Sequence, residues 1–315
     1  MSKLYQGSLH IGIVHFMAFP HAARDPKAAL ETIREIANDE FFQVIELTHI
    51  PDDQTRKQIR KVLEDAHMEV GFAAQPILLW NKLNPSSLDD DERSKAVEAL
   101  KEAVDEAYEL GAAIMGMLSG PYPGEEHKSA AMKKLVESIV SVCRYAQEKT
   151  PPGRKPLTIT LESFDRDVDR KCLIGPSVDA AQVAEEVKEH VDNFGICIDL
   201  SHLPLLNETP EDCMATLGEH LIHVHVGNCV KQPSHPLYGD QHPPFGIEGG
   251  ENDIEELRVF IEALIYSGYL RRSVPTKLPW LTFEIKPLPD QDIKTVLAAT
   301  KRVFYEAWCK SGGGF

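Results

Sequence analysis

The sequence predicts an α/β protein in which 315 residues form a single (β/α)8 barrel. Short apolar runs rich in β-branched residues alternate with longer segments whose apolar residues recur at helical spacing. This alternation repeats along the chain with no break in composition. Near-continuous apolar strands between helices are typical of a parallel sheet. Eight such units in roughly 250–300 residues are typical of a closed barrel.

Each expected strand is an apolar run that is too short for a helix. In chain order the runs are LHIGIVHF (from Leu9), FQVIELTH (from Phe42), EVGFAAQP (from Glu69), AIMGMLSG (from Ala113), LTITLES (from Leu157), FGICIDLSH (from Phe194), LIHVHVGN (from Leu221) and WLTFEIKP (from Trp280).

Helix signals lie between these runs. Asp25 is a suitable N-cap before Pro26, and Gly111 is a stop signal after DDERSKAVEALKEAVDEAYELG. The acidic run LDDDER, residues 88–93, is interpreted as a helix N-terminus, where carboxylates suit the helix dipole. Asp253 is the expected cap of the helix after the seventh strand. Further helices are expected in HKSAAMKKLVESIVSVCRYAQEK, SVDAAQVAEEVKEHVDN and DQDIKTVLAATKRVFYEAW.

An open, doubly wound sheet is the alternative architecture. The sequence has no GxGxxG after the first strand and no GxxxxGK[ST], and its eight units are similar in size, so the barrel is favoured. We therefore expect one barrel domain over residues 1–310. The last residues, SGGGF at 311–315, are expected to form a flexible C-terminal tail.

Composition argues against several classes of partner. The net charge of -16, with no segment dense in Lys or Arg, argues against nucleic acid binding. No apolar run approaches the ~18 residues of a membrane span, and the first residues lack the apolar region of a signal peptide. The cysteines are scattered without a CxxC, which fits reduced thiols and neither a disulfide scaffold nor a Cys-type zinc site. We expect a cytoplasmic protein.

Ionisable side chains stand at or near the ends of four consecutive strands, where barrel enzymes carry their chemistry. They are Glu162 in TLESFD, Asp199 in CIDLSH, His225 in LIHVHVGN and Glu284 in TFEIKP. Burying them singly would cost on the order of several kcal/mol each, and converging carboxylates would also repel one another. A divalent cation resolves both problems, whereas four unrelated buried salt bridges are the alternative. We predict one metal ion, with Mn²⁺ the first choice and Mg²⁺, Co²⁺ or Zn²⁺ also suitable.

Two histidines of the seventh strand share one face because side chains alternate along a strand. His225 is nearer the strand end and is assigned to the metal. His223 is one layer deeper and is expected to form hydrogen bonds beside the site or in the core.

The set LES, IDLSH, HVHVGN and FEIKP resembles the xylose isomerase-like TIM barrel superfamily. It is most similar to the sugar phosphate isomerases/epimerases, which include ketose 3-epimerases, hydroxypyruvate isomerases and inosose dehydratases. The resemblance covers essentially the whole chain. It implies the same four metal ligands and a substrate-facing histidine three residues after Asp199, which is His202.

The resemblance also implies a reaction. In such enzymes the two glutamate ligands, here Glu162 and Glu284, act as base and acid and move a proton next to a carbonyl through a metal-stabilised enediolate. Two positions depart from the epimerase pattern. That pattern has a further glutamate where this chain has Val168, and an arginine where this chain has Lys231. Substrate anchoring is therefore expected to differ, with Lys231 as one candidate contact.

Other strand ends supply further candidates for substrate binding. Glu46 either binds substrate hydroxyls or pairs with a neighbouring cation. His15 either lines the pocket or is a core histidine, and Lys286 either orients the substrate or forms a plain salt bridge. The Pro-, Gly- and His-rich segment 229–252 is long for a connecting loop and is interpreted as a lid or binding loop. A structured surface loop or an oligomer contact is the alternative.

The predicted function is that of a metal-dependent sugar isomerase or epimerase. A dehydratase acting on a keto-polyol such as an inosose is the alternative, and a zinc-dependent apurinic endonuclease is a remote one, because the third and fourth strands end without histidine. The expected partner is a small sugar or keto-polyol. We expect it to be unphosphorylated, because no Gly-rich loop or Arg cluster follows the last two strands. A homo-dimer or homo-tetramer is expected.

Overall fold

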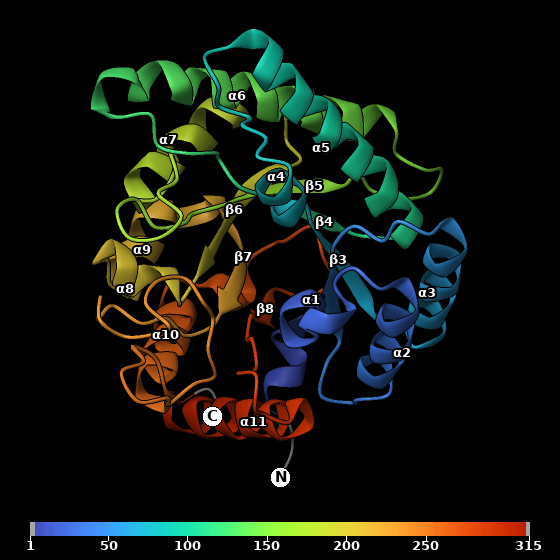
Figure 1. The fold of residues 1–315 in the computed structure, drawn as a ribbon, viewed down its shortest axis with the longest axis vertical. Helices are drawn as coiled ribbons and strands as arrows, with labels where there is room; N and C mark the ends of the chain where they lie inside the picture. Colours follow the sequence, from blue (N-terminus) through green and yellow to red (C-terminus); the bar gives the residue numbers. More distant parts are fainter. Residues whose placement is uncertain (1–3, 313–315) are drawn as a thin grey trace.

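Parallel strands close into a barrel, in the order β1 to β8, in the computed structural model, which describes residues 4–312 (Figure 1). The (β/α)8 fold predicted from the sequence is therefore confirmed. Most of the predicted tail, residues 313–315, lies outside the described residues. The strands are β1 (His10–Val14), β2 (Val44–Leu47), β3 (Glu69–Ala73), β4 (Ile114–Met117), β5 (Thr158–Glu162), β6 (Phe194–Asp199), β7 (Leu221–Val226) and β8 (Trp280–Phe283).

Helices surround the barrel on its outer side (Figure 1). The longer ones are α2 (Pro26–Ala37), α3 (Asp53–Asp65), α5 (Asp90–Leu110), α6 (Glu125–Glu148), α7 (Ser177–Lys188), α9 (Pro210–Leu217), α10 (Ile254–Tyr266) and α11 (Ile293–Lys310). Short helices follow three of the strands closely: α1 (His15–Ala18), α4 (Gln75–Trp80) and α8 (His202–Leu206). Single 3-10 turns occupy Leu4–Gly7, Pro20–Ala22, Gly218–His220 and Tyr269–Arg271.

Local sequence sets the ends of these helices as expected. The Asp25 carboxylate accepts hydrogen bonds from the backbone N–H groups of Lys27 (3.0 Å) and Ala28 (3.3 Å) at the start of α2. Helix α5 ends at Gly111, which has a φ of 83° that favours glycine. Helix α3 gave no clear signal in the sequence because it buries only a narrow stripe of its surface, Thr55, Ile59 and Leu63.

The inside of the barrel is filled at its amino-terminal end. Trp280, Val44 and Ile114, the first residues of β8, β2 and β4, form a separate buried apolar cluster there. The remaining core residues pack between the outer face of the barrel and the helices. Because these side chains close the amino-terminal end of the barrel, the cavity lies at the carboxyl ends of the strands.

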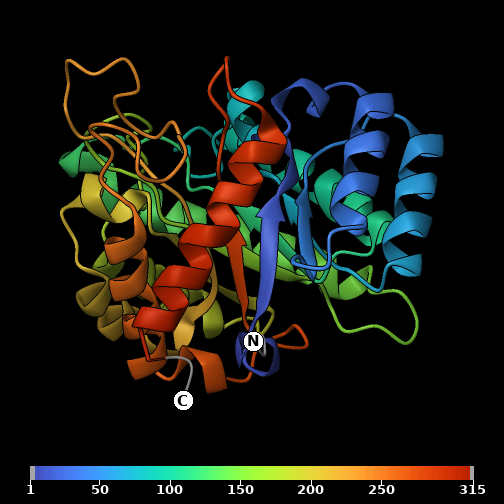
Figure 2. The same cartoon turned by 90° about the horizontal axis from the view of Figure 1, so that it is seen from below.

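The two ends of the barrel carry different parts of the chain (Figure 2). The strands point towards the end at which the long segment between β7 and α10 lies, and the described chain begins and ends on the opposite side. Within residues 4–312, no helix has both the length and the apolar character needed to cross a membrane. The cysteines of this part of the chain are free thiols, as predicted.

We predict that Asp25→Ala lowers the free energy of unfolding by about 1 kcal/mol, because α2 loses the acceptor for its first N–H groups. Urea denaturation followed by circular dichroism measures the change. Glu31→Ala, at an exposed position of the same helix, is the control and should cost less. Equal effects of the two substitutions would contradict the capping role.

Candidate metal centre

The four predicted metal ligands converge. One ligand atom each of Glu162, Asp199, His225 and Glu284 lies within 4.8 Å of the others. The strands that carry them are staggered, since Asp199 is opposite His225 in the sheet whereas Glu162 is opposite Cys197. Strands in a closed barrel tilt, and this tilt brings staggered positions to the same level. Residues far apart in the sequence therefore meet at one point.

Buried polar atoms at this point lack hydrogen-bond partners. They are Oε1 of Glu162, Oδ2 of Asp199 and Nδ1 of His225. The His225 Nδ1 atom lies 3.0 Å from Oε2 of Glu284 and 3.3 Å from Oε1 of Glu162, but neither contact has hydrogen-bond geometry. Unsatisfied polar atoms are costly inside a protein. Three carboxylates and one imidazole that face one another in this way fit a divalent cation.

Glu46 fixes the orientation of His225. The Nε2 atom of His225 lies 3.2 Å from both carboxylate oxygens of Glu46, and Nε2 of His223 lies 2.9 Å from its Oε1. A hydrogen on Nε2 leaves Nδ1 of His225 with a lone pair for a metal. Gly71 makes room for this carboxylate, because a Cβ at Gly71 would lie 2.8 Å from Cγ of Glu46. Burial raises the pKa of Glu46, but the two imidazoles outweigh it and hold that pKa well below its usual range.

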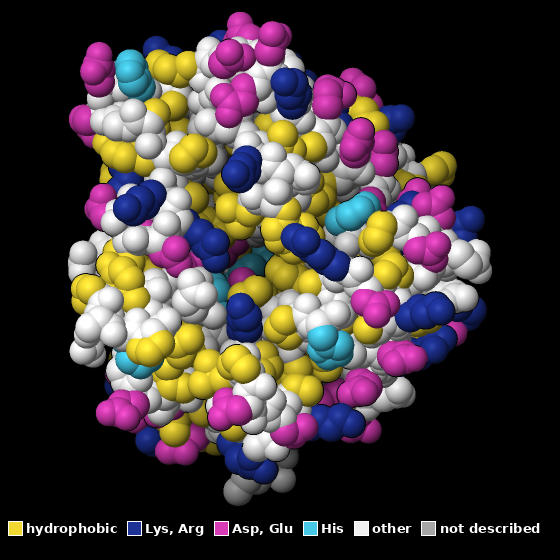
Figure 3. All heavy atoms as spheres, viewed as in Figure 1, with side chains coloured by type: hydrophobic (Ala, Val, Ile, Leu, Met, Phe, Trp, Pro, Cys, Tyr) yellow, Lys and Arg dark blue, Asp and Glu magenta, His cyan; other side chains and the backbone are white. Residues whose placement is uncertain are grey.

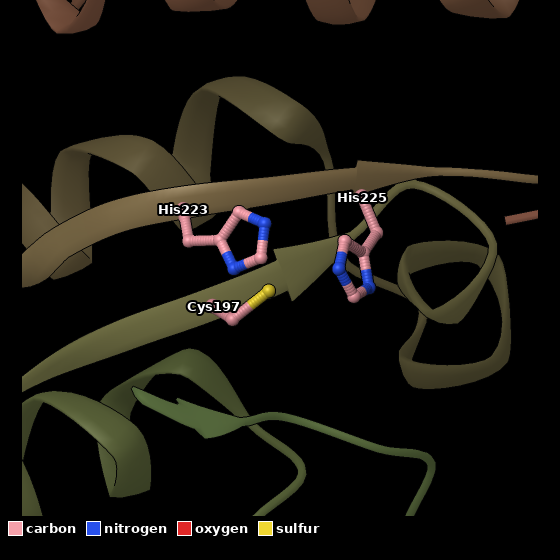
Figure 4. A group of neighbouring side chains, drawn as sticks. All are labelled: Cys197, His223 and His225. Atoms are coloured by element: carbon pink, nitrogen blue, oxygen red, sulfur yellow. The ribbon is translucent and has the colours of Figure 1, made fainter. Parts of the chain in front are cut away.

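A thiol lies beneath this pair of histidines (Figure 4). Cys197 of β6 is opposite His223 in the sheet, and one ligand atom each of Cys197, His223 and His225 lies within 4.8 Å of the others. The two imidazole rings meet edge to face with centroids 4.6 Å apart. Burial raises the pKa of Cys197 well above its ordinary value, which keeps the thiol protonated. Spacing along the chain paired the two histidines but gave no sign of Cys197, because the thiol lies on the neighbouring strand.

Gln75 is a site residue that the sequence did not reveal. It begins α4, directly after β3, and its Nε2 donates a hydrogen bond to Oε2 of Glu162 at 2.6 Å. Gly116 leaves space for the amide, since a Cβ there would lie 2.8 Å from Nε2 of Gln75. Burial raises the pKa of Glu162, but His225, His202 and Gln75 together lower it. An amide at a strand end carries no charge pattern that would have singled it out.

The long segment between β7 and α10 returns two residues to the site. His242 Nε2 lies 2.7 Å from Oδ1 of Asp240 and 3.6 Å from Oε1 of Glu284, and its Nδ1 lies 3.8 Å from Oδ2 of Asp199. Burial lowers the pKa of His242, but Asp240 and Glu284 outweigh it and raise that pKa to about 10. The sequence marked the segment as a binding loop without distinguishing these two residues from its other polar side chains.

His202, the predicted substrate-facing histidine, is buried with both ring nitrogens engaged. Its Nδ1 donates to the backbone oxygen of Ser163 at 2.7 Å, and its Nε2 lies 3.1 Å from Oδ1 of Asp240. Burial lowers the pKa of His202, but Asp240, Asp199 and Glu162 raise it to about 9. The histidine is part of the site but does not line the cavity.

Three other predicted substrate contacts are not brought to the cavity. His15 lies in the core, where its Nε2 is 2.7 Å from Oγ1 of Thr32 and its ring stacks on Phe19. Lys231 donates a hydrogen bond to Oδ1 of Asn207 at the surface (2.8 Å). The side chain of Lys286 is exposed. The structure thus favours the core alternative for His15, and Glu46 is the one of these four candidates that lines the cavity.

The cavity opens at the carboxyl ends of the strands (Figure 3). In this view a hollow near the centre has carboxylate and histidine side chains at its floor, with hydrophobic and cationic side chains around it. The apolar residues that line it are Val14, Phe16, Met17, Ala73, Pro76, Leu79 and Phe164. The polar ones are Glu46, Gln75, Glu162, Arg170, His225, Asp240, His242 and Glu284.

A sequence model described as "Xylose isomerase-like TIM barrel" matches residues 33–275. The chain belongs to this family. The match includes β2 to β7 and three of the four converging ligands, and the resemblance inferred from the strand ends is thereby confirmed.

Several proteins resemble this xylose isomerase-like barrel. The uncharacterized protein MJ1311 of Methanocaldococcus jannaschii is 24% identical over 245 residues, which cover 73% of each chain. Solved structures share the fold at lower identity. A D-tagatose 3-epimerase-like protein (18% identity, TM-score 0.69) matches 96% of this chain and 99% of its own. An L-ribulose 3-epimerase (16% identity, TM-score 0.72) matches 96% of this chain and 95% of its own. The IOLI protein, which was solved with a zinc atom (11% identity, TM-score 0.69), matches 96% of this chain and 99% of its own.

The core position of His15 predicts a pH dependence of stability. Burial, with a smaller contribution from His21, lowers its pKa to about 3, whereas the unfolded chain has an ordinary value of about 6.5. The stability that neutral His15 contributes is therefore complete above about pH 6.5 and is lost as the pH falls towards 3. Between pH 7.5 and 5.5 the loss is roughly 1.4 kcal/mol.

Chemical denaturation of wild type and His15→Gln at these two pH values measures this loss. The stability difference between the two proteins should shrink by roughly 1.4 kcal/mol at the lower pH, because glutamine does not titrate. A difference that is independent of pH would show that His15 is not held neutral.

Proposed function

We propose that this protein is a divalent-metal-dependent sugar isomerase or epimerase that moves a proton next to a carbonyl group. The observation that carries the proposal is the convergence of Glu162, Asp199, His225 and Glu284 at the floor of the cavity. Two of the structures that share the fold are a 3-epimerase and a 3-epimerase-like protein, and a third was solved with a zinc atom. These likenesses support the same class of reaction here.

The four converging residues would hold one divalent cation, with Mn²⁺ the first candidate because three of the four donors are carboxylates. When bound, such an ion polarises a substrate carbonyl and lowers the pKa of the neighbouring C–H group. Glu46 supports this centre by holding His225 through Nε2, and Gln75 supports it by holding Glu162.

The two glutamates have suitable positions for base and acid. Glu284 is the most exposed of the four ligands, with 14% of its side chain accessible, so it reaches the cavity. Glu162 lies deeper, with 2% accessible. One carboxylate oxygen removes the proton from carbon, and a proton returned to the opposite face gives an epimer. A proton returned to the neighbouring carbon gives the isomeric aldose or ketose.

The cavity suits an unphosphorylated sugar. Among the described residues that line it, Arg170 is the one lysine or arginine, and its Nε is already paired with Oδ2 of Asp240 at 2.8 Å. Apolar residues among the lining, such as Phe16, Met17 and Phe164, would limit the access of water to a bound substrate. His202 acts on the site through Asp240, to which its Nε2 is directed.

A dehydratase acting on a keto-polyol is the second candidate. It requires the same proton removal, followed by loss of a hydroxyl group. His242 favours this candidate, because its Nε2 lies 3.6 Å from Glu284 and a protonated imidazole there is able to protonate a departing hydroxyl. Product analysis separates the two candidates, since only the dehydratase loses water.

We predict that Glu284→Gln slows proton exchange by about 10²–10⁴-fold, because the amide cannot accept the proton. The metal-loaded protein is incubated with a panel of unphosphorylated ketoses in D₂O, and deuterium incorporation is followed by NMR. Glu248→Gln, at an exposed position of the β7–α10 segment, is the control and should leave the rate unchanged. Wild-type exchange in Glu284→Gln would overturn the assignment.

We further predict that Glu46→Gln weakens metal binding by about 10–100-fold, because the imidazole of His225 loses the carboxylate that orients it. Competition with a chelator gives the dissociation constant. Glu69→Gln is the matched control, since it disrupts another partly buried histidine–glutamate pair, His10–Glu69 (2.5 Å), which lies at the first residues of β1 and β3. Equal weakening by both substitutions would point to a general loss of stability.

A further inference from the structure

We infer that Arg170 anchors the substrate by donating hydrogen bonds from Nη1 and Nη2 to its hydroxyl groups, and that the substrate is an uncharged polyhydroxy ketone. The inference deepens the proposed function and rests on it for the position of the reacting end, which the four-ligand centre would hold. Arg170 lines the cavity, and 34% of its side chain is accessible. Its guanidinium therefore reaches the space that a substrate would occupy.

The hydrogen bonds of Arg170 leave donors for a ligand. A guanidinium carries several N–H groups in one plane. The Nε atom donates to Oδ2 of Asp240 at 2.8 Å, and Nη2 donates to the backbone oxygen of the same residue at 3.3 Å. Within the described chain, Nη1 and the second hydrogen of Nη2 have no acceptor. Because arginine keeps its proton in proteins, these groups can only donate, and substrate oxygens are suitable acceptors.

Other side-chain nitrogens of the lining face carboxylates of the site. Nε2 of Gln75 lies 2.6 Å from Oε2 of Glu162, and Nε2 of His242 lies 2.7 Å from Oδ1 of Asp240. The acidic residues of the lining accept hydrogen bonds when they are ionised. A sugar hydroxyl can donate to such carboxylates, but its own lone pairs need a donor. Arg170 supplies that donor.

The backbone around Arg170 is held in place without a substrate. The Arg170 N–H donates to Oδ2 of Asp165 at 2.7 Å. Oδ1 of this fully buried carboxylate accepts from the N–H groups of Val168 and Asp169, at 2.7 Å each. Oδ2 of Asp169 in turn accepts from the N–H of Asp240 at 3.0 Å. Both residues of the ion pair Arg170–Asp240 are thus fixed, and an ordered donor loses little entropy when it binds a ligand.

The charges around Arg170 favour an uncharged ligand. Its own positive charge is paired with Asp240, whose side chain is 1% accessible. The other acidic residues of the lining are Glu46, Glu162 and Glu284. A carboxylate or phosphate group on the substrate would add negative charge to this buried set, whereas a hydroxyl group accepts the same hydrogen bonds without that cost. A neutral ketose therefore suits the site better than a sugar acid does.

Arg170 lies beside the metal centre and is not part of it. Its partner Asp240 contacts Nε2 of His242 at 2.7 Å, and this nitrogen lies 3.6 Å from Oε1 of Glu284. The guanidinium would therefore meet hydroxyl groups away from the reacting carbons of a bound ketose. The sequence gave no sign of this role, because Arg170 lies within the charged run DRDVDRK, residues 165–171, beyond the end of β5.

Binding and exchange measurements with neutral ketoses test the inference. The metal-loaded protein is titrated with D-fructose, D-psicose and D-tagatose, and saturation-transfer NMR gives dissociation constants without any turnover. Deuterium incorporation in D₂O gives kcat and KM for the same sugars. Arg170→Lys, which can keep an ion pair with Asp240 but lacks the planar fork, should weaken binding and raise KM by about 10–100-fold. We expect kcat to change little, because the contact lies away from the reacting carbons.

Deoxy sugars identify the contact. For a form of the preferred ketose that lacks the contacted hydroxyl group, wild type and Arg170→Lys should bind equally. A loss in Arg170→Lys that is the same for every deoxy form would show that Arg170 only supports Asp240, and would overturn the inference. Arg166→Lys is the matched control and should bind like wild type. Arg166 belongs to the same segment and pairs with Asp179 at 2.7 Å, but it does not line the cavity.

A sugar acid tests the charge of the substrate. D-fructuronate carries a carboxylate in place of the terminal hydroxymethyl group of D-fructose, and it should bind wild type more weakly than D-fructose does. Tighter binding of the acid that is lost in Arg170→Lys would overturn the assignment of an uncharged substrate. Arg170→Gln provides a second variant if Arg170→Lys does not fold, and the same losses are expected from it.

The outcomes separate this inference from the proposed function. Ketose binding that depends on Arg170, without deuterium exchange in wild type, would support the anchor and overturn the proposed function. Exchange in wild type with an unchanged KM in Arg170→Lys would overturn the anchor and leave the function. Neither binding nor exchange with any ketose of the panel would count against both.

Discussion

Compensation of buried negative charge is the constraint on which this site depends. The carboxyl end of the barrel holds Glu46, Glu162, Asp199, Asp240 and Glu284, and each except Glu284 is almost wholly inaccessible. Carboxylates are stable inside a protein only with positive charge or hydrogen-bond donors around them. The remaining polar residues of the site, which are histidines, one arginine and one glutamine, follow from this requirement.

Two of these carboxylates share one arrangement, in which a carboxylate oxygen lies against two imidazoles. Glu46 Oε1 contacts Nε2 of His223 and of His225, at 2.9 and 3.2 Å. Asp240 Oδ1 contacts Nε2 of His202 and of His242, at 3.1 and 2.7 Å. The first pair comes from one strand, whereas the second joins the end of β6 to a distant segment. In the first pair Nδ1 of each ring is left without a hydrogen-bond partner, whereas in the second pair Nδ1 of His202 also contacts the backbone oxygen of Ser163.

The backbone provides space for these side chains at positions without a Cβ. Gly71 admits Glu46, Gly116 admits Gln75, and Gly227 admits His242. The buried cluster around Trp280 closes the opposite end of the barrel, so the cavity has a single polar floor. Apolar packing at the amino-terminal end of the barrel and glycines near the site thus determine where the polar groups can meet.

The sequence by itself determined the fold and the four-ligand centre, because both depend on periodicity. Alternating apolar runs and helical segments repeat along the chain, and parallel strands place their carboxyl ends together, so Glu162, Asp199, His225 and Glu284 could be expected to converge. Only the tertiary structure decided the roles of the remaining residues. The path of the β7–α10 segment brings Asp240 and His242 to the site, and the start of α4 places Gln75 beside Glu162. His15 instead packs against Thr32 and Phe19 in the core and does not reach the cavity. Such contacts depend on loop paths and side-chain orientations in three dimensions, which no spacing along the chain records.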